Sequence, residues 1–196
     1  MKIIGIGGTN GAGKDTIAAM LVERHNYLFV SATDIFVKEL NKRGWPIDRT
    51  HKSRLSAEWR REYGMAVVVD KAIEFAQAHI GSRSGVVIAS LRHPSEADHV
   101  HAFKGVVVWA DANPKVRYDR IQRSLHERVN THAEQGKTFE EFLADEEREM
   151  HPEGDAATLN MAGVKEKADI MLLNNDDDIP AFKNKAEVAL TGYINS

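Results

Sequence analysis

The chain has 196 residues, of which 42% are apolar, with 26 Lys and Arg against 29 Asp and Glu. This length corresponds to one domain of about 100–200 residues, and the apolar content is enough to fill a core, which excludes a disordered chain. The chain has no cysteine, which excludes disulfides, thiolate metal sites and a cysteine nucleophile. The net charge of −3 gives no general basic surface, so we expect no nucleic-acid partner.

The longest apolar stretches, such as 86–89 and 106–110, are far shorter than the ~20 residues that cross a bilayer. We therefore expect no membrane partner. The N-terminus has one Lys followed by a short, glycine-interrupted run, which does not match a signal peptide. The sequence thus predicts a cytoplasmic protein, and nothing in it indicates an oligomeric state.

Strand-like and helix-like segments alternate along the whole chain. The expected strands are 2–7, 27–30, 86–90, 106–110 and 170–173, and the expected helices are about 14–24, 35–43, 50–63, 65–80, 95–102, 114–123, 138–149 and 179–190. This alternation is typical of an α/β domain with a five-stranded parallel sheet. The first, third and fourth strands are nearly all apolar, which predicts helices on both faces, hence three layers.

The first strand leads directly into a glycine-rich phosphate-loop pattern. Residues 8–14 match G-x-x-x-x-G-K, and a helix follows immediately. Glycines let backbone N–H groups point inward, the helix N-terminus adds positive potential, and Lys14 adds a point charge for the outer phosphates. We therefore expect ATP to bind the following residues: Gly8, Asn10, Gly11, Ala12, Gly13, Lys14, Asp15 and Thr16.

Asp15 stands where this pattern usually has Ser or Thr, whose hydroxyl is a magnesium ligand. Asp15 can hold Mg²⁺ through a water while the Thr16 hydroxyl contacts phosphate, so both are candidate metal residues. The alternative for Asp15 is an acidic residue of the first helical turn, which the helix dipole favours. Asp111, after the fourth strand, is another candidate for magnesium-bound water, or simply a turn residue.

Several segments resemble small P-loop kinases of the nucleoside or deoxynucleoside monophosphate kinase type, with features of the dephospho-CoA kinase-like branch. The similarity lies in 13–16, 34–40, 58–64, 90–96 and 109–120. It implies a P-loop NTPase fold over 1–196, with an acceptor-binding helical insertion at 35–80 and a lid at about 120–137. Ser90 stands where many relatives have an Asp, so the usual second magnesium anchor is missing here.

Phosphoryl transfer requires positive charge around the moving oxygens, which makes arginines near strand ends informative. Four arginines follow the fourth strand: Arg117, Arg120, Arg123 and Arg128. The first three are spaced by three and share roughly one helical face. The resemblance implies catalytic arginines on a lid that closes over ATP, and the alternative is a solvated face paired with Glu127 and the acidic stretch 140–149.

The resemblance also places acceptor-binding arginines at Arg60 and Arg92, for which the alternative is a surface ion pair. Asp34 follows the second strand and is a candidate substrate-binding and catalytic residue. It would orient the acceptor or deprotonate a hydroxyl acceptor, or else it only caps the next helix.

Near the C-terminus, the resemblance implies that Asn174 and Asn175 border the adenine. Asp176-Asp177-Asp178 read best as N-caps of the last helix. His93, His99 and His101 lack the spacing of a metal site, so we expect no histidine-bound metal.

These features together predict ATP- and Mg²⁺-dependent transfer to a small phosphorylated acceptor, most simply a nucleoside or deoxynucleoside monophosphate. One alternative is dephospho-CoA kinase, although residues 31–34 lack the Asp-Ala-Asp run of that family. The other is a nucleotide-binding regulator that transfers no phosphoryl group to a small molecule.

Overall fold

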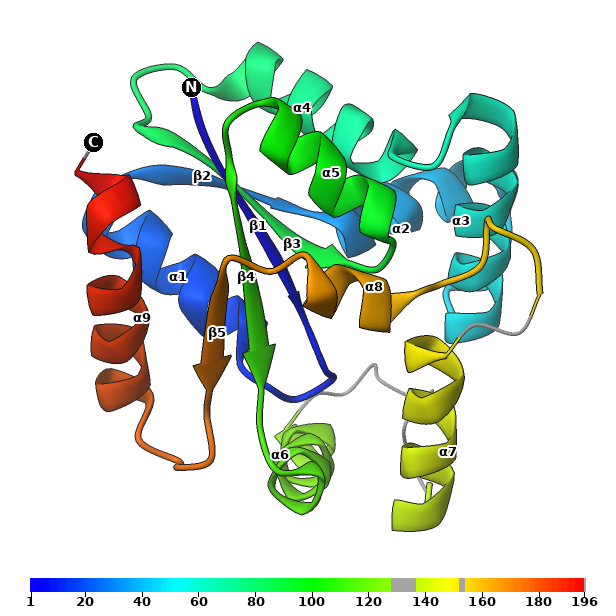
Figure 1. Cartoon of the computed structure of the whole chain (residues 1–196). Helices are drawn as coiled ribbons and strands as arrows, with labels where there is room; N and C mark the ends of the chain where they lie inside the picture. Colours follow the sequence, from blue (N-terminus) through cyan, green and yellow to red (C-terminus); the bar gives the residue numbers. More distant parts are fainter. Residues whose placement is uncertain (128–136, 152–153, 196) are drawn as a thin grey trace.

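The computed structural model describes residues 1–127, 137–151 and 154–195. Its strands are β1 (Lys2–Gly8), β2 (Tyr27–Ser31), β3 (Gly85–Leu91), β4 (Val106–Asp111) and β5 (Ile170–Leu173). They form one parallel sheet in the order β2-β3-β1-β4-β5 (Figure 1). The predicted five-stranded parallel sheet is therefore confirmed, and β1 lies at its centre.

The helices of the described chain also follow the predicted order. They are α1 (Lys14–His25), α2 (Ala32–Arg43), α3 (Arg49–Tyr63), α4 (Val67–His79), α5 (Pro94–Ala102), α6 (Pro114–Glu127), α7 (Phe139–Met150), α8 (Met161–Glu166) and α9 (Ile179–Ile194). α8 was not predicted, because six residues are too few to show a helical period. α2 begins three residues before its predicted start at residue 35, since Ser31 caps that helix at the end of β2.

Helices cover both faces of the sheet (Figure 1). Alternate strand residues such as Ile4, Ile6 and Val87 pack against α1 and α9, whereas Ile3, Val86 and Ile88 pack against α4, α5 and α8. Each such buried aliphatic side chain contributes about 1.5–3 kcal/mol relative to exposure. The domain is thus the predicted three-layer α/β fold.

Two groups of helices lie outside these layers. Between β2 and β3, α2 and α3 pack on the start of α4 through a separate apolar cluster that includes Phe36, Leu55 and Trp59. Beyond the carboxyl ends of the strands, α6 lies beside α7 (Figure 1). Both groups border the edge of the sheet where parallel α/β domains bind ligands. Within the described ranges, no helix has the length and apolar content needed to cross a membrane.

Candidate functional site

The phosphate loop has the strand–loop–helix geometry that the sequence predicted. β1 ends at Gly8, and α1 begins at Lys14 with Gly13 as its N-cap. Gly8, Gly11 and Gly13 have φ of 144°, 79° and 95°, values that L side chains rarely adopt. A Cβ on Gly8 would also collide with the carbonyl oxygen of Ala110 on the neighbouring β4. The glycines are therefore required for the backbone to wrap, and the following helix offers its free N–H groups to an anion.

Hydrogen bonds brace this loop from inside and from β4. The Lys14 Nζ donates to the carbonyl oxygens of Gly8 (3.0 Å) and Thr9 (2.7 Å). The Thr9 hydroxyl donates to Asp111 Oδ1 at 2.8 Å, and the same oxygen accepts from the Ala112 N–H at 2.9 Å. Asp111 therefore acts as a turn residue, as one alternative held, and also anchors the first residues of the loop.

The pKa of Lys14 reflects a site built for an anion. Burial lowers this pKa to about 8, and the positive charges of Arg92 and Arg117 act in the same direction, whereas Asp15 and Glu149 raise it. These side chains come from four separate segments, yet all of them are close enough to affect Lys14 electrostatically. Two arginines thus lie near Lys14, and a phosphate group would relieve their repulsion of its ammonium.

Asp15 and Thr16 lie in the first turn of α1, where the Thr16 N–H donates to the Gly13 carbonyl at 3.1 Å. The Asp15 side chain is exposed, so both interpretations of Asp15 fit this position. At the end of β3, Ser90 has a positive φ of 76°, a conformation that is uncommon for a residue with a side chain. Among the described residues, no cluster of three or more His, Asp or Glu could hold a metal ion.

Arg117 is the buried arginine of α6, with 3% of its surface exposed. Its guanidinium donates to the carbonyl oxygens of Ala112 (2.7 Å) and Asn10 (3.4 Å) and pairs with Glu146 at 2.6 Å. It therefore links the phosphate loop to α7. The alternative interpretation of these arginines expected a pairing with the acidic stretch 140–149, but on a solvated face, whereas Arg117 is buried.

The other arginines of this group lie elsewhere. Arg120 pairs with Asp177 at 2.9 Å and donates to the carbonyl oxygen of Asn174, while Arg123 pairs with Asp177 at 2.8 Å. The two therefore contact the loop before α9 rather than the glycine loop. Arg128 and half of the predicted lid, residues 128–136, lie outside the described residues.

Asn174 and Asn175 lie between β5 and α9, beside the phosphate loop. The Asn174 side-chain amide donates to the Ala12 carbonyl at 3.0 Å, and the Asn175 Oδ1 accepts from the Asn113 N–H at 2.8 Å. The predicted cap of α9 is confirmed at Asp178, whose carboxylate accepts from the Ala181 N–H. Asn174 thus connects the β5–α9 loop to the phosphate loop, and Asn175 connects it to the turn after β4.

Arg92 follows β3 and faces α7. Its Nη1 pairs with Glu149 Oε2 at 2.8 Å, and one third of its side chain is exposed. The other Glu149 oxygen pairs with Arg49, the first residue of α3, at 2.6 Å. Burial raises the pKa of Glu149, but Arg92 and Arg49 lower it more, so the pKa stays below its ordinary value and the group is ionised.

Arg60 lies away from the loop, in the interior beside α5. It is 2% exposed, and its guanidinium pairs with Glu96 at 2.7 Å and donates to the Ser56 hydroxyl at 2.6 Å. We therefore leave Arg60 out of the acceptor site, because its charge is already compensated inside the protein. Asp34 does not cap α2 either, since Ser31 holds that position and accepts from the Asp34 N–H at 3.4 Å.

Three residues of the site were not predicted from the sequence: Arg49, Glu146 and Glu149. Glu146 and Glu149 are spaced by three, which puts them on one helical face. That spacing was readable in the acidic stretch, but their arginine partners are distant in sequence. Only the folded chain identifies these contacts.

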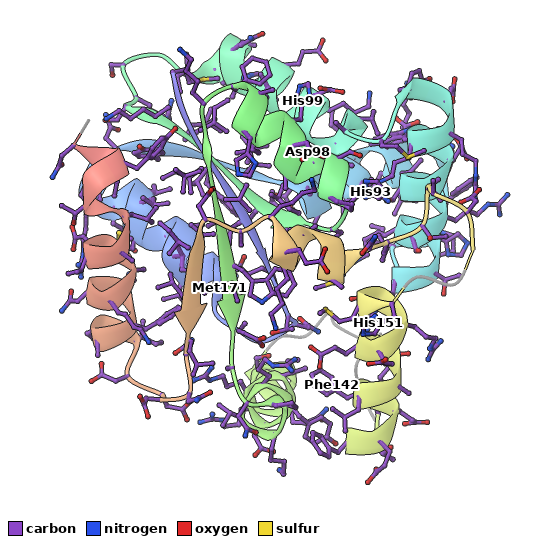
Figure 2. The ribbon with its side chains drawn as sticks, in the orientation of Figure 1. His93, Asp98, His99, Phe142, His151 and Met171 are labelled. Carbon is purple, nitrogen blue, oxygen red and sulfur yellow. The ribbon has the colours of Figure 1, made fainter. Side chains whose placement is uncertain are left out.

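A cleft of about 510 Å³ opens between the loop, the end of β4, α6 and α7. Its lining includes Thr9, Asp111, Arg117, Leu143, Glu146 and His151. Phe142 lies between α6 and α7 (Figure 2), with its ring centroid 5.5 Å from the Arg117 guanidinium carbon. The cleft adjoins the phosphate loop and has the size of a small-molecule site.

Comparisons with known proteins agree with this geometry. A UPF0200 protein of Methanococcus maripaludis is 24% identical over 197 residues, covering 100% of this chain and 99% of the relative. The structure of TT1252 from Thermus thermophilus has a TM-score of 0.60 at 19% identity, covering 98% of this chain and 97% of that one. The shikimate kinase of Bacteroides thetaiotaomicron has a TM-score of 0.58 at 14% identity, covering 97% and 98%.

These solved structures show that the fold is that of small P-loop kinases. The model of the AAA domain family AAA_18 matches residues 4–151, which is more than half of the chain and includes the whole phosphate loop. The chain belongs to this AAA domain family.

Proposed function

We propose that this protein transfers the γ-phosphoryl group of ATP to a small phosphorylated acceptor, a nucleoside or deoxynucleoside monophosphate. The observation that carries the proposal is the positive charge at the glycine loop, where Lys14 donates to the Gly8 and Thr9 carbonyls, Arg117 donates to the Asn10 carbonyl, and the charge of Arg92 acts on Lys14. Phosphoryl transfer depends on positioning and on positive charge at the moving oxygens, which such a group supplies. An acceptor oxygen attacks the γ-phosphorus, the bond to the β–γ bridging oxygen breaks, and ADP leaves.

Magnesium would be held at the start of α1. The residues for it are Asp15, through water, and Thr16, together with phosphate oxygens, because Mg²⁺ keeps several waters and takes few protein ligands. An exposed carboxylate and a hydroxyl in one helical turn fit this coordination. When bound, the ion neutralises charge that develops on the phosphates. Asp111, fixed beside Thr9, is a further carboxylate for its water shell.

The roles of the remaining candidates follow from their elements. Arg92 and the α2–α4 region would contact the acceptor, because both border the sheet edge on the β2–β3 side of the loop. Asn174 and Asn175 would border the adenine on the β5 side. The proposed lid arginines are still Arg120, Arg123 and Arg128. Arg120 and Arg123 would have to leave their ion pairs with Asp177 in order to bind phosphate.

A hydroxyl acceptor, as in dephospho-CoA kinase, is a second candidate. The observation that favours it is Asp34, an exposed carboxylate in the first turn of α2 at the same sheet edge. A phosphate acceptor is already ionised at neutral pH and needs no base, whereas a hydroxyl acceptor does. Under this alternative, Asp34 would accept the hydroxyl proton.

A coupled ADP-release assay with ATP and Mg²⁺ tests these proposals. Common nucleoside monophosphates, their deoxy forms and dephospho-CoA are compared at one concentration, with Lys14→Ala as the control variant. We expect Lys14-dependent release with one or a few monophosphates. Release with dephospho-CoA alone would favour the hydroxyl acceptor and Asp34 as its base. Nucleotide binding without release for any acceptor would contradict the kinase proposal and favour a regulator.

A further inference from the structure

The helix α7 is strongly acidic although it lies against a phosphate-binding loop. Its sequence FEEFLADEEREM contains six acidic residues and one arginine. We define its acidic face as Asp145, Glu146 and Glu149. Negative charge close to a phosphate site repels the ligand unless it is compensated or moves away.

The acidic face holds arginines from three separate elements. Glu146 pairs with Arg117 of α6, and Glu149 pairs with Arg92 after β3 and with Arg49 of α3. Each of these contacts has the form that a phosphate would make, with guanidinium N–H groups donating to anionic oxygens. The carboxylate of Glu149 is also close enough to raise the pKa of Lys14.

The space between α7 and the loop is open where the cleft is lined by Thr9, Arg117 and Glu146, but it is nearly filled beside Arg49 and Glu149. A cavity of only about 10 Å³ lies among Asn10, Arg49, Phe142, Glu146 and Glu149. A single water needs ~10–15 Å³ of such space, so the cavity cannot admit a phosphate group. A phosphate between Arg49 and the loop therefore requires α7 to move.

The packing of α7 permits such a movement. Phe142 is its only buried residue among twelve. Phe139 contacts Tyr118 and Met150 packs at the border of the main core, while Glu146 and Glu149 make ion pairs. Figure 1 shows α7 beyond the strand ends and outside the three layers. Elements with few buried apolar contacts open at a small free-energy cost.

We propose that the acidic face of α7 is a built-in competitor of phosphate: its carboxylates hold the arginines that a phosphorylated ligand binds, so ligand binding and the docking of α7 exclude each other. This inference rests on the proposed function, because it assumes that the glycine loop binds phosphates. The inference adds that docked α7 is autoinhibitory. Part of the free energy of ligand binding is then used to release α7 from the arginines.

The test measures binding of inorganic pyrophosphate, which needs no base or acceptor recognition, by isothermal titration calorimetry. Glu149→Gln removes the competing charge but keeps the shape, and Asp145→Asn with Glu149→Gln removes two charges. Glu140→Gln is the matched control, because Glu140 is an exposed acid of the same helix. We expect Glu149→Gln to tighten binding about fivefold relative to Glu140→Gln, and the double variant to tighten it further.

Hydrogen exchange in the unmodified protein gives a second readout. On saturation with pyrophosphate, backbone amides of 139–150 should exchange faster while those of 8–16 become protected. Slower exchange in α7 with ligand, or equal or weaker binding by Glu149→Gln, would overturn the proposal and make Glu149 a positioning residue for its arginines.

The kinase proposal can fail independently of this one. Pyrophosphate binding with the expected pattern, but no ADP release with any acceptor, would keep the competitor and reject the kinase. ADP release together with weaker pyrophosphate binding by Glu149→Gln would support the kinase proposal and reject the competition between α7 and phosphate. If even the double variant bound no pyrophosphate, the proposed competition would also be refuted, since no phosphate site would have been uncovered.

Discussion

At the scale of single residues, Lys14 is the group whose environment most clearly indicates its role. Its ammonium is bonded to two carbonyl oxygens of its own loop and lies among arginines. Burial of this charge opposes folding, since the folded-state pKa of about 8 lies below the ordinary value of 10.5. A residue kept at a cost to stability is typical of a binding site rather than of a scaffold.

Lys14→Ala should abolish phosphoryl transfer, because the outer phosphates lose their point charge. The free energy of unfolding should stay within about 1 kcal/mol of the unmodified protein or increase, because an unfavourably buried charge is removed. ADP release and urea denaturation measure the two effects on the same preparation. Full activity in this variant would contradict the assignment of the loop.

The affinity for ADP should depend on pH through the same residue. In the free protein, Lys14 is protonated below about pH 8 and loses its proton above it. Bound phosphate favours the protonated form of Lys14. The affinity for ADP is therefore highest below pH 8 and falls by up to about tenfold per pH unit above pH 8. Calorimetric titrations between pH 7 and 9.5 would measure this. Lys14→Ala should bind weakly with no such decline, and an equal decline there would assign the effect to another group.

At the scale of elements, the ion pair between Arg60 of α3 and Glu96 of α5 fixes the helical insertion to the main layers. Both side chains are 1% exposed. Glu96 also accepts from the Arg92 and His93 N–H groups at the start of α5. The helices between β2 and β3 are thus positioned through a buried charge pair between α3 and α5.

Arg60→Met should lower the free energy of unfolding by about 3–5 kcal/mol, because Glu96 would be left buried without its partner. The double variant Arg60→Met with Glu96→Gln should recover part of this loss, since the unpaired charge is also removed. Urea denaturation of the single and double variants measures both values. A stable Arg60→Met protein whose only defect was a raised acceptor KM would restore the acceptor role for Arg60.

At the scale of the whole molecule, the parts of the fold that depend on local pattern were predictable. Apolar runs located the strands, and the glycine spacing located the loop, because a strand and a helix must flank such a turn. The approximate helix positions followed from the same alternation. α8 was missed because six residues do not reveal a period.

The contacts that assemble the site were not predictable in the same way. Arg49, Arg92 and Glu149 lie far apart in the chain, and a sequence alone does not state which charges meet. The burial of Arg60 was not predictable for the same reason, because it depends on Glu96 in another helix. Local patterns predict elements, whereas long-range electrostatic pairing appears only once the elements are packed.

The central position of β1 has a consequence for how the protein is made. β1 pairs with β3 and β4, so Ile4 meets Val87 on one side and Val106 on the other. The loop after β1 is also held by β4, since the Thr9 N–H donates to the Ala110 carbonyl. During synthesis, β1 therefore has no partner strand until β3 (Gly85–Leu91) has been made, and its loop lacks this contact until β4 follows. The nucleotide-binding loop is thus translated well before the strands that hold it in shape.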